Sequence, residues 1–528
     1  MIVTIIITFL LFIFILLTYN FYVHYGRNGR FINRIPGPSG YPIIGNLLYF
    51  THLYKDLFKF LISLNQNYSI FKLWLFFTPI VAIRHPDDIE VILRSMTHIE
   101  KSFLYKPFQN AVNTGLFTSG GTKWRSRRKI LTPTFHFAIL QQFADTLIKK
   151  GENMAKCLKN MEDTVVEDLT SFVSEHILNA FCETVIGTSQ GLPSLQIPFE
   201  DIIQQGTEIM MYRVMRLWLY NDWIFSLTSK GRHQKMLIKM MNAFTQKLIS
   251  ERKLYHERTN GRYLKTSNKT DKTDKNTLAE KDDSETITIK KKRLAMMDML
   301  IAASRENYLI DSDIQEEINT IMIAGTDTTS MTMTYVLLLL AEHKDVQDRV
   351  RVEINAAIHK DGGKLIMQSL HNLSYLERCI KETLRLYPVA YVISRITSKD
   401  VKLQSYLVPA GTTLLINIHG VHRDPNYWSN PEIFDPDRFL PENIQNQHPY
   451  SYLPFSAGPR NCIGRQFALL QLKAMLTPLI YNFYLEPIEY LKDIQLKGDI
   501  LIRPTYPLRL KFVPIIKTHT DIKANIDP

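Results

Sequence analysis

The sequence predicts a mainly α-helical fold with a smaller β-rich portion, behind one apolar N-terminal segment. Residues 124–255 are mainly helical in pattern, and a further long helix is expected over 311–343. Short aromatic and β-branched runs at 69–84, and short runs between turn residues beyond Pro388, predict the strands. A chain of 528 residues can bury a sizeable core without covalent staples.

Residues 1–25 are predicted to form a transmembrane signal anchor. The first 23 residues carry no charged side chain, which is long enough for one helix to cross a bilayer. Arg27, Arg30 and Arg34 follow, and basic residues on this flank place the remainder of the chain in the cytosol. The alternative, a cleaved signal peptide, would have a shorter apolar region and a small-residue cleavage site.

A basic and proline-rich hinge is predicted over residues 26–45, because "PGPSGYPIIG" at 36–45 favours a stiff, non-helical connector. The folded domain is expected to span residues 46–516, with a C-terminal tail over 517–528. Within the domain, two strands are predicted in 69–84, followed by a helix from Pro86.

Residues 256–293 are rich in Lys, Asp, Thr and Asn and are predicted to form a low-complexity charged surface insert. The helix over 311–343 is expected to begin with a capping box at Ser312 and Gln315. A second capping box, Ser374 with Glu377, predicts a helix that ends before Pro388. One last helix is expected after Gly464.

The net charge of +12 is compatible with nucleic acid, an anionic membrane or an acidic protein partner. The basic stretches do not interleave with aromatic residues and no DNA-binding motif accompanies them, so no nucleic-acid partner is expected. The four cysteines form no CxxC pair, which argues against a disulfide scaffold or a zinc site and favours a reducing compartment.

One cysteine lies in a dense motif, "FSAGPRNCIGRQ", with the spacing F-x-x-G-x-R-x-C-x-G. The glycines allow backbone amides close to the sulfur, and the following helix directs its N-terminal dipole there; both effects favour a thiolate. A nucleophile, a structural cysteine and a thiolate metal ligand all remain open. The motif residues are Phe455, Gly458, Arg460, Cys462 and Gly464.

This motif resembles that of the cytochromes P450, the haem-thiolate monooxygenases, and the resemblance covers almost the whole chain after the anchor. It implies haem b with Cys462 as the axial iron ligand, Arg460 on a propionate and Phe455 near the ring. It also implies a single anchor in the endoplasmic reticulum membrane, dioxygen and a lipophilic substrate. Electrons would come from NADPH through a separate P450 reductase, with cytochrome b5 as a further candidate partner.

A second motif, "AGTDTT" at 324–329, stands where the long helix should be regular. Gly325 and the threonines are poor helix formers, so the motif predicts either a helix start or a local mid-helix opening beside a small ligand. The P450 resemblance favours the opening, with Thr328 and Asp327 as the proton-delivery pair.

Two longer stretches resemble the animal fourth family of P450s, known for fatty-acid ω-hydroxylases. They are "KWRSRRKILTPTFHF" and "HPYSYLPFSAGPRNCIGRQFA". Many mammalian members carry a glutamate that esterifies the haem, where this chain has Ala324. Non-covalent haem is therefore expected, and strict terminal hydroxylation is less strongly implied.

The spacing E-x-x-R at Glu382 and Arg385 is weak by itself, and the apolar stripe of the helix over 374–387 puts both on the opposite face. Pattern alone predicts an exposed pair of little energetic value. The resemblance implies a buried structural network completed by Arg438, with a role in folding and haem retention.

Trp124 and Arg128 are four residues apart, so on a helix they share one face and could meet a haem propionate; a solvated basic face is the alternative. Arg395 matches a further propionate contact of the resembled family. Substrate-pocket candidates are Phe117, Ile323, Val389 and Val392.

The function predicted is insertion of one oxygen atom of dioxygen into a fatty acid, terpenoid or hormone-like lipid, hydrocarbon or foreign compound. The alternatives are a haem-thiolate isomerase or dehydratase, a non-haem cysteine enzyme, and a membrane-tethered interaction protein.

Overall fold

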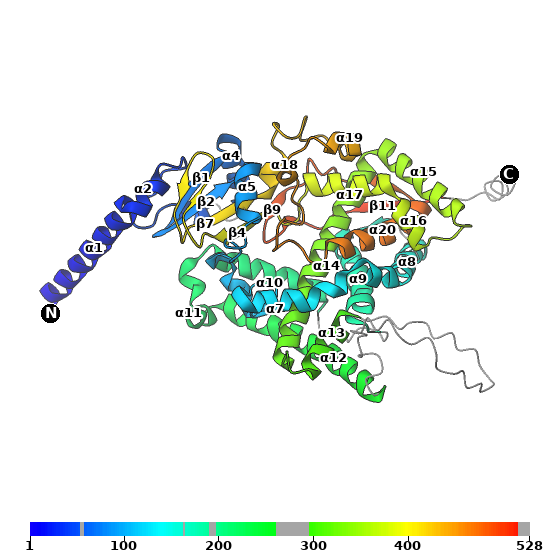
Figure 1. The fold of residues 1–528 in the computed structure, drawn as a ribbon, viewed down its shortest axis with the longest axis horizontal. Helices are drawn as coiled ribbons and strands as arrows, with labels where there is room; N and C mark the ends of the chain where they lie inside the picture. The colour runs from blue at the N-terminus through cyan, green and yellow to red at the C-terminus, as the bar shows by residue number, and fades with distance from the viewer. Residues whose placement is uncertain (53–56, 162–163, 189–196, 260–294, 516–528) are drawn as a thin grey trace, which may run out of the picture.

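The computed structural model describes residues 1–52, 57–161, 164–188, 197–259 and 295–515 (Figure 1). Most of the predicted charged insert and the whole predicted tail, residues 260–293 and 517–528, lie outside this part of the chain. The predicted start of the insert at 256 is wrong, because α12 (Ser229–Arg258) continues through it. His256 is fully buried on that helix, and its Nε2 lies 2.6 Å from Oδ1 of Asp298.

Helices make up most of the domain, as predicted, and α14 (Asp311–Glu342) runs through its centre. It contacts α9 (Leu169–Phe181), α12, α17 (Ser374–Leu386) and α20 (Arg465–Asn482), while α8 (Phe137–Lys159) packs along α20. The other helices are α3 (Leu47–His52), α4 (Leu57–Asn67), α5 (Pro86–Leu93), α6 (Gln109–Val112), α7 (Gly121–Leu131), α10 (Phe199–Val214), α11 (Asp222–Ser226), α13 (Met296–Arg305), α15 (Lys344–Lys360), α16 (Met367–Asn372), α18 (Ile418–His422) and α19 (Pro441–Ile444).

The β-rich portion is small; its largest sheet lies towards the N-terminal helices, and another sheet lies on the opposite side of the domain near α16 (Figure 1). Its main sheet has the order β1-β2-β7-β4, in which the predicted hairpin β1 (Ile70–Leu75) and β2 (Thr78–Ile83) joins β7 (Thr413–Asn417) and β4 (Val392–Ile396). The smaller sheets are β3 (Val165–Val166) with β11 (Leu510–Pro514) and β8 (Phe483–Pro487), β5 (Val401–Lys402) with β6 (Leu407–Val408), and β9 (Leu496–Gly498) with β10 (Ile502–Pro504).

The first helix, α1 (Ile2–Tyr25), projects from the body with its apolar side chains exposed. It is long and apolar enough to cross a membrane, by length and composition. The predicted hinge after it is partly helical, since α2 (Arg27–Asn33) occupies its first half. Ile32 and Ile35 are buried against the main sheet, so this segment is packed onto the domain.

At both predicted capping boxes, the free N–H groups of the helix bind carboxylates other than the predicted ones. The long helix begins one residue before Ser312, and the N–H of Ile310 donates to the Asp313 carboxylate at 3.0 Å. At the start of α17, the carboxylate of Glu353 on α15 accepts from the N–H groups of Tyr375 and Leu376. A side chain from another helix satisfies these free amides, which a local sequence pattern cannot reveal.

Candidate active site

Cys462 lies in the loop that leads into α20, two residues after Arg460. Cys462 retains accessible surface, and the surrounding protein atoms nevertheless desolvate its thiol. The Cys462 N–H donates to the Phe455 carbonyl at 2.9 Å and closes the loop. Burial raises the pKa of Cys462, while the Gly464 N–H and the charges of Arg128 and Arg465 lower it. The predicted amide and charge effects are present, but in the protein alone burial outweighs them.

The two glycines of this loop do different things. Gly458 has φ +71°, and a Cβ there would lie 1.9 Å from the Leu93 carbonyl oxygen. Only glycine suits that backbone and that approach. At Gly464 the backbone has an ordinary φ of −88°, and an added Cβ would meet only Phe135, at 3.9 Å. The predicted approach of a backbone amide to the sulfur is made by Gly464, whose N–H hydrogen-bonds to Cys462, whereas Gly458 allows the loop to approach the Leu93 carbonyl.

Four cations surround the interior side of this loop, and we call them the cation cluster: Lys101, Arg128, Arg395 and Arg460. Within the described residues no carboxylate forms an ion pair with any of them. Arg460 donates from Nη1 to the Ile99 carbonyl at 3.0 Å, and Arg395 from Nη1 to the Ser394 carbonyl at 2.8 Å. Burial, followed by repulsion from Arg395, lowers the pKa of Arg460 to about 10. Glu100 acts on Arg460 without forming an ion pair, so the four cations together still favour an anionic ligand.

Arg128 connects the cation cluster to the cysteine loop. It donates to the carbonyl and the side-chain oxygen of Asn461, at 2.9 and 2.7 Å. The buried Trp124 shares its helix, α7, and the Arg460 guanidinium lies 5.1 Å from the Trp124 ring centroid. The predicted pair on α7 is thus brought together with Arg460 next to Cys462.

Lys101 was missed by the sequence analysis. Its Nζ lies 4.2 and 4.9 Å from the ring centroids of Tyr105 and Phe117. Burial lowers its pKa well below the ordinary value, and Arg395 and Arg460 lower it further. Nothing in "HIEKSFLYK" marks this lysine, because its neighbours in the cluster come from distant parts of the chain.

Glu382, Arg385 and Arg438 form a buried network, in which Glu382 and Arg385 are fully buried. Arg385 donates from Nε and Nη2 to the two Glu382 oxygens at 2.7 Å each, and Nε of Arg438 lies 3.3 Å from Glu382. Carbonyls of His422, Pro431 and Ile433 accept from Arg385. The exposed pair that the helical pattern favoured is therefore wrong, since the segment from His422 to Arg438 covers the polar face of α17.

The motif "AGTDTT" lies within one continuous helix, so the predicted interruption of α14 is wrong. Thr328 donates its hydroxyl to the Ala324 carbonyl at 2.7 Å, one turn back. Gly325 is required for packing, because a Cβ there would lie 2.3 Å from the ring of Phe181 on α9. Asp327 is held by Arg503 of β10, whose Nη2 is 2.6 Å from both carboxylate oxygens. Arg503 carries no motif and was also missed.

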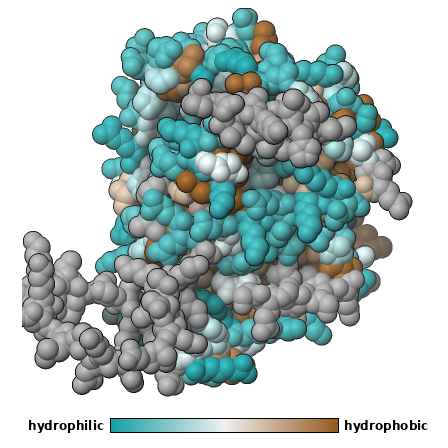
Figure 2. All heavy atoms as spheres, turned by 90° about the vertical axis from the view of Figure 1, so that its right-hand side faces the viewer, coloured by the Kyte–Doolittle hydropathy of each residue, from teal (hydrophilic) through white to brown (hydrophobic). Residues whose placement is uncertain are grey.

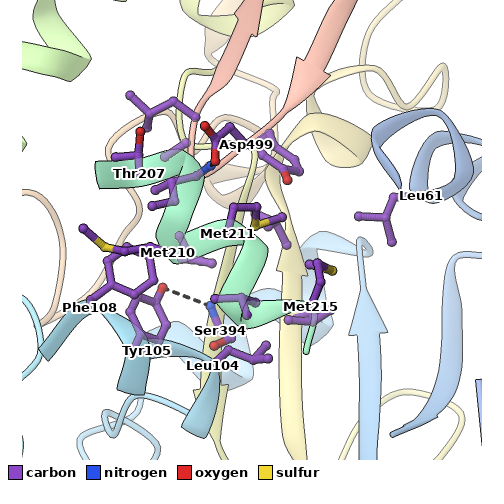
Figure 3. A pocket seen from close by; sticks show the side chains of 18 of the residues that line it. Leu61, Leu104, Tyr105, Phe108, Thr207, Met210, Met211, Met215, Ser394 and Asp499 are labelled. Atoms are coloured by element: carbon purple, nitrogen blue, oxygen red, sulfur yellow. Dashed lines mark hydrogen bonds between the residues drawn. The ribbon is translucent and has the colours of Figure 1, made fainter. Parts of the chain in front are cut away.

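An interior cavity of about 310 Å³ borders this part of α14. Its walls are mainly apolar and aromatic, and Figure 3 shows Tyr105, Phe108, Met210 and Met215 around it. Ala324, Asp327 and Thr328 line it, as do the predicted residues Phe117, Ile323 and Val392. Val389 does not; it is buried, and its carbonyl accepts from the Ile502 N–H.

A family model described as cytochrome P450 matches residues 35–512. The chain belongs to the cytochrome P450 family. It is 36% identical over 495 residues to cytochrome P450 4c21 of Blattella germanica, with 92% of this chain and 95% of that relative covered. It is 34% identical to cytochrome P450 4V2 of Mus musculus, over 93% and 91% of the two chains. Cytochrome P450 4c3 of Drosophila melanogaster is also 34% identical, over 92% and 90%.

This P450 is accordingly a haem-thiolate monooxygenase, and its fourth-family resemblance is confirmed. The family's cofactor has an iron that takes a cysteine thiolate and two carboxylates that need cations. Cys462 and the adjoining cation cluster fit both requirements, and no described carboxylate forms an ion pair with the cation cluster. Ala324 places a methyl group at the cavity, which offers no atom for an ester bond.

Proposed function

We propose that this P450 oxidises a lipophilic substrate taken from a membrane, with Cys462 as the axial ligand of non-covalently bound haem b. The substrate classes in view are a fatty acid, a terpenoid or hormone-like lipid, a hydrocarbon or a foreign compound. When bound, haem supplies the activation of dioxygen. The observation that carries the proposal is the cation cluster beside Cys462, whose four cations form no ion pair with a carboxylate among the described residues.

Thr328 and Asp327 are proposed to handle protons at the cavity wall. Thr328 lines the cavity, and its hydroxyl proton is held by the Ala324 carbonyl. Asp327 is next to it, and its carboxylate is fixed by Arg503. A hydroxyl that can change its hydrogen-bond partner, beside a carboxylate that can exchange a proton, forms a two-residue relay.

A membrane location is proposed from the apolar surface, with the endoplasmic reticulum as the compartment and the catalytic domain in the cytosol. Apolar side chains of α1 are exposed along its length, and Trp218, Trp223 and Leu227 around α11 are exposed as well. In Figure 1, α1 and α11 lie on the same side of the molecule. The face seen in Figure 2 is instead dominated by hydrophilic side chains where described residues are visible. Leu217, next to Trp218, lines the cavity, which supports substrate entry from the lipid side.

An NADPH-dependent P450 reductase is proposed as the electron donor, with cytochrome b5 as a second candidate. Arg125, Lys129 and Arg465 are exposed basic residues on α7 and α20, the two helices that hold Arg128 and follow Cys462. An acidic surface on the partner would be attracted to this side, close to the thiolate.

The difference spectrum of the reduced full-length protein with carbon monoxide tests the proposal. The red-shifted band of a thiolate-bound haem is expected in the wild type and in Cys157→Ala, and its loss is expected in Cys462→Ala. Cys157 is a free, exposed cysteine and serves as the matched control. A band that survives in Cys462→Ala would refute the ligand assignment. A wild-type band without NADPH-dependent uptake of dioxygen into product would instead indicate an isomerase or dehydratase.

A further inference from the structure

Three polar side chains line one wall of the cavity, and we call them the polar trio: Asn65, Tyr391 and His419. Their exposed fractions are 9%, 4% and 9%, so each is more than nine-tenths buried. Asn65 comes from α4, Tyr391 immediately precedes β4, and His419 belongs to α18. Thr328 lines the cavity from a different element, α14, so the polar trio is separate from the proposed proton relay.

Backbone bonding and ring packing hold this wall in place. The His419 N–H donates to the Tyr391 carbonyl at 3.1 Å. The ring of Phe58 stands edge-on to the rings of Tyr391 and His419, with the centroids 5.3 Å apart in each case. Asn65 lies about two helical turns beyond Phe58 on the same face of α4, which also carries Leu61 at the cavity in Figure 3. The three polar side chains are therefore positioned before a ligand arrives.

The side chains of the polar trio form no hydrogen bond with another described residue. Their polar atoms are also not sealed inside protein, because the unpartnered atoms that lack accessible surface belong to other residues in the described part of the chain. Other polar side chains of the cavity are engaged: Thr207 and Thr320 donate to backbone carbonyls, and the Tyr105 hydroxyl accepts from a backbone N–H. The polar trio is thus left to bind the contents of the cavity.

The polar trio is uncharged at neutral pH. Burial lowers the pKa of His419 well below its ordinary value, and Arg423 and His422 lower it further. Burial raises the pKa of Tyr391, and the charge of Asp499 raises it further. A carboxylate near Tyr391 would be repelled by Asp499, and a cation near His419 would be repelled by Arg423. A neutral imidazole, a phenol and an amide each donate and accept hydrogen bonds, which suits an uncharged oxygen.

We propose that the polar trio binds an uncharged oxygen function of the substrate, so that this P450 prefers neutral oxygenated lipids, such as esters and alcohols, to hydrocarbons and free fatty acids. The inference rests on the proposed function, since it names the substrate class for that same cavity. The three side chains are in this view specificity residues: they fix one end of a molecule whose remainder packs against the apolar walls.

Equilibrium dialysis of the full-length holoenzyme in lipid nanodiscs, with empty nanodiscs as the blank, would test this with methyl dodecanoate, 1-dodecanol, tridecane and dodecanoate. The wild type should bind the ester and the alcohol more tightly than the other two. Tyr391→Phe removes the hydroxyl and keeps the ring against Phe58, so the affinity for the ester and the alcohol should fall roughly three- to tenfold, the value of one hydrogen bond. Tridecane and dodecanoate should bind as before.

Asn65→Leu removes the amide at similar volume and should act in the same direction. The matched controls are Tyr308→Phe and Asn67→Leu, which change exposed side chains outside the cavity and should alter none of the four affinities. A loss confined to the ester would identify donation to a carbonyl, and a loss confined to the alcohol would identify acceptance from a hydroxyl. Either result supports the inference.

A selective loss for the oxygenated ligands separates recognition from a structural role, because a distorted cavity would weaken tridecane binding as well. Equal losses for all four ligands, or no loss in either cavity variant, would overturn the inference. A wild type that binds dodecanoate more tightly than its methyl ester would overturn it too. A normal carbon monoxide band without a preference for neutral oxygenated ligands would defeat this inference alone; a wild type that lacks the band would defeat the proposed function.

Discussion

Arg503 donates through Nη2 to both carboxylate oxygens of Asp327, at 2.6 Å to each. Both side chains are almost fully buried. Burial by itself would lower the pKa of Arg503, but Asp327 more than offsets this and the pKa is raised. The pair therefore joins the middle of α14, which carries the proposed proton relay, to the β9–β10 hairpin.

Removing this arginine should destabilise the domain strongly. Arg503→Met leaves Asp327 buried without its cation, and breaking one partner of a buried pair typically costs about 3–5 kcal/mol. Arg509→Met is the matched control, because the Arg509–Glu489 pair is partly exposed and should contribute less than about 1 kcal/mol. Urea unfolding of both variants, followed by circular dichroism, measures the difference. Equal losses would show that burial of the Arg503 pair has no energetic consequence.

The hydroxyl of Thr328 should matter for turnover more than for binding. Thr328→Val keeps the shape but removes the hydroxyl, and the rate at saturating substrate should fall on the order of tenfold or more. Thr320→Val is an unusually close control: Thr320 is also on α14, also lines the cavity and donates to the carbonyl one turn back, at 2.7 Å. Steady-state rates and substrate affinities of the two variants decide the matter. A similar loss of rate in Thr320→Val would contradict a specific relay.

Lys101 should have opposite effects on the two forms of the protein. In the absence of haem, Lys101→Met removes a cation next to Arg395 and Arg460, so the apoprotein should gain about 1 kcal/mol. In the holoenzyme the same change removes a partner for a propionate, so haem should dissociate several-fold faster. Transfer of haem to excess apomyoglobin and urea unfolding of the apoprotein measure the two quantities. Lys106→Met, an exposed lysine five residues away, should change neither.

Periodicity predicted the elements whose stability depends on their own sequence. The β1–β2 hairpin and α14 were expected within a few residues of their observed bounds, because alternating or helical apolar patterns are local properties. Two other features were not predicted, because each depends on residues from another element. They are the capping of α17 by Glu353 and the docking of residues 26–35 onto the sheet.

The candidate site divides in the same way. The cysteine loop is a contiguous motif, so five of its residues were found from spacing. Lys101 and Arg503 are single residues whose surroundings are assembled only in the folded chain. For Glu382 and Arg385 the helical pattern of α17 predicted exposed side chains. Both are buried, because the pattern contains no information about the segment that covers them.

Acid should weaken the protein partly through Glu377. Burial by itself would raise the pKa of this carboxyl, but hydrogen bonds and charge from Lys381 and Lys473 lower it to about 2. The stabilisation is present above the ordinary value of 4.5 and is lost as pH falls towards 2. Because the side chain is one-third exposed, we expect a contribution of only about 1 kcal/mol. At pH 7 the unfolding free energy of Glu377→Gln should be lower than that of the wild type. The difference between the two proteins should shrink as the pH falls below 4.5 and be nearly absent close to pH 2, which urea unfolding at a series of acidic pH values measures. Glu251→Gln, which removes an exposed carboxylate with no ion pair among the described residues, should run parallel to the wild type.

The two glycines that flank Cys462 should differ in their tolerance of a methyl group. Gly458→Ala forces a side chain onto a backbone at φ +71° and against the Leu93 carbonyl, so we expect a loss of more than about 3 kcal/mol. Gly464→Ala meets open space at an ordinary φ and should cost less than about 1 kcal/mol. The yield of protein with the carbon monoxide band and its urea midpoint measure both effects. Because the two substitutions lie within four residues of Cys462 and on either side of it, equal damage would mean that the loop is sensitive to any added bulk near the thiolate, and the steric distinction between Gly458 and Gly464 would be wrong.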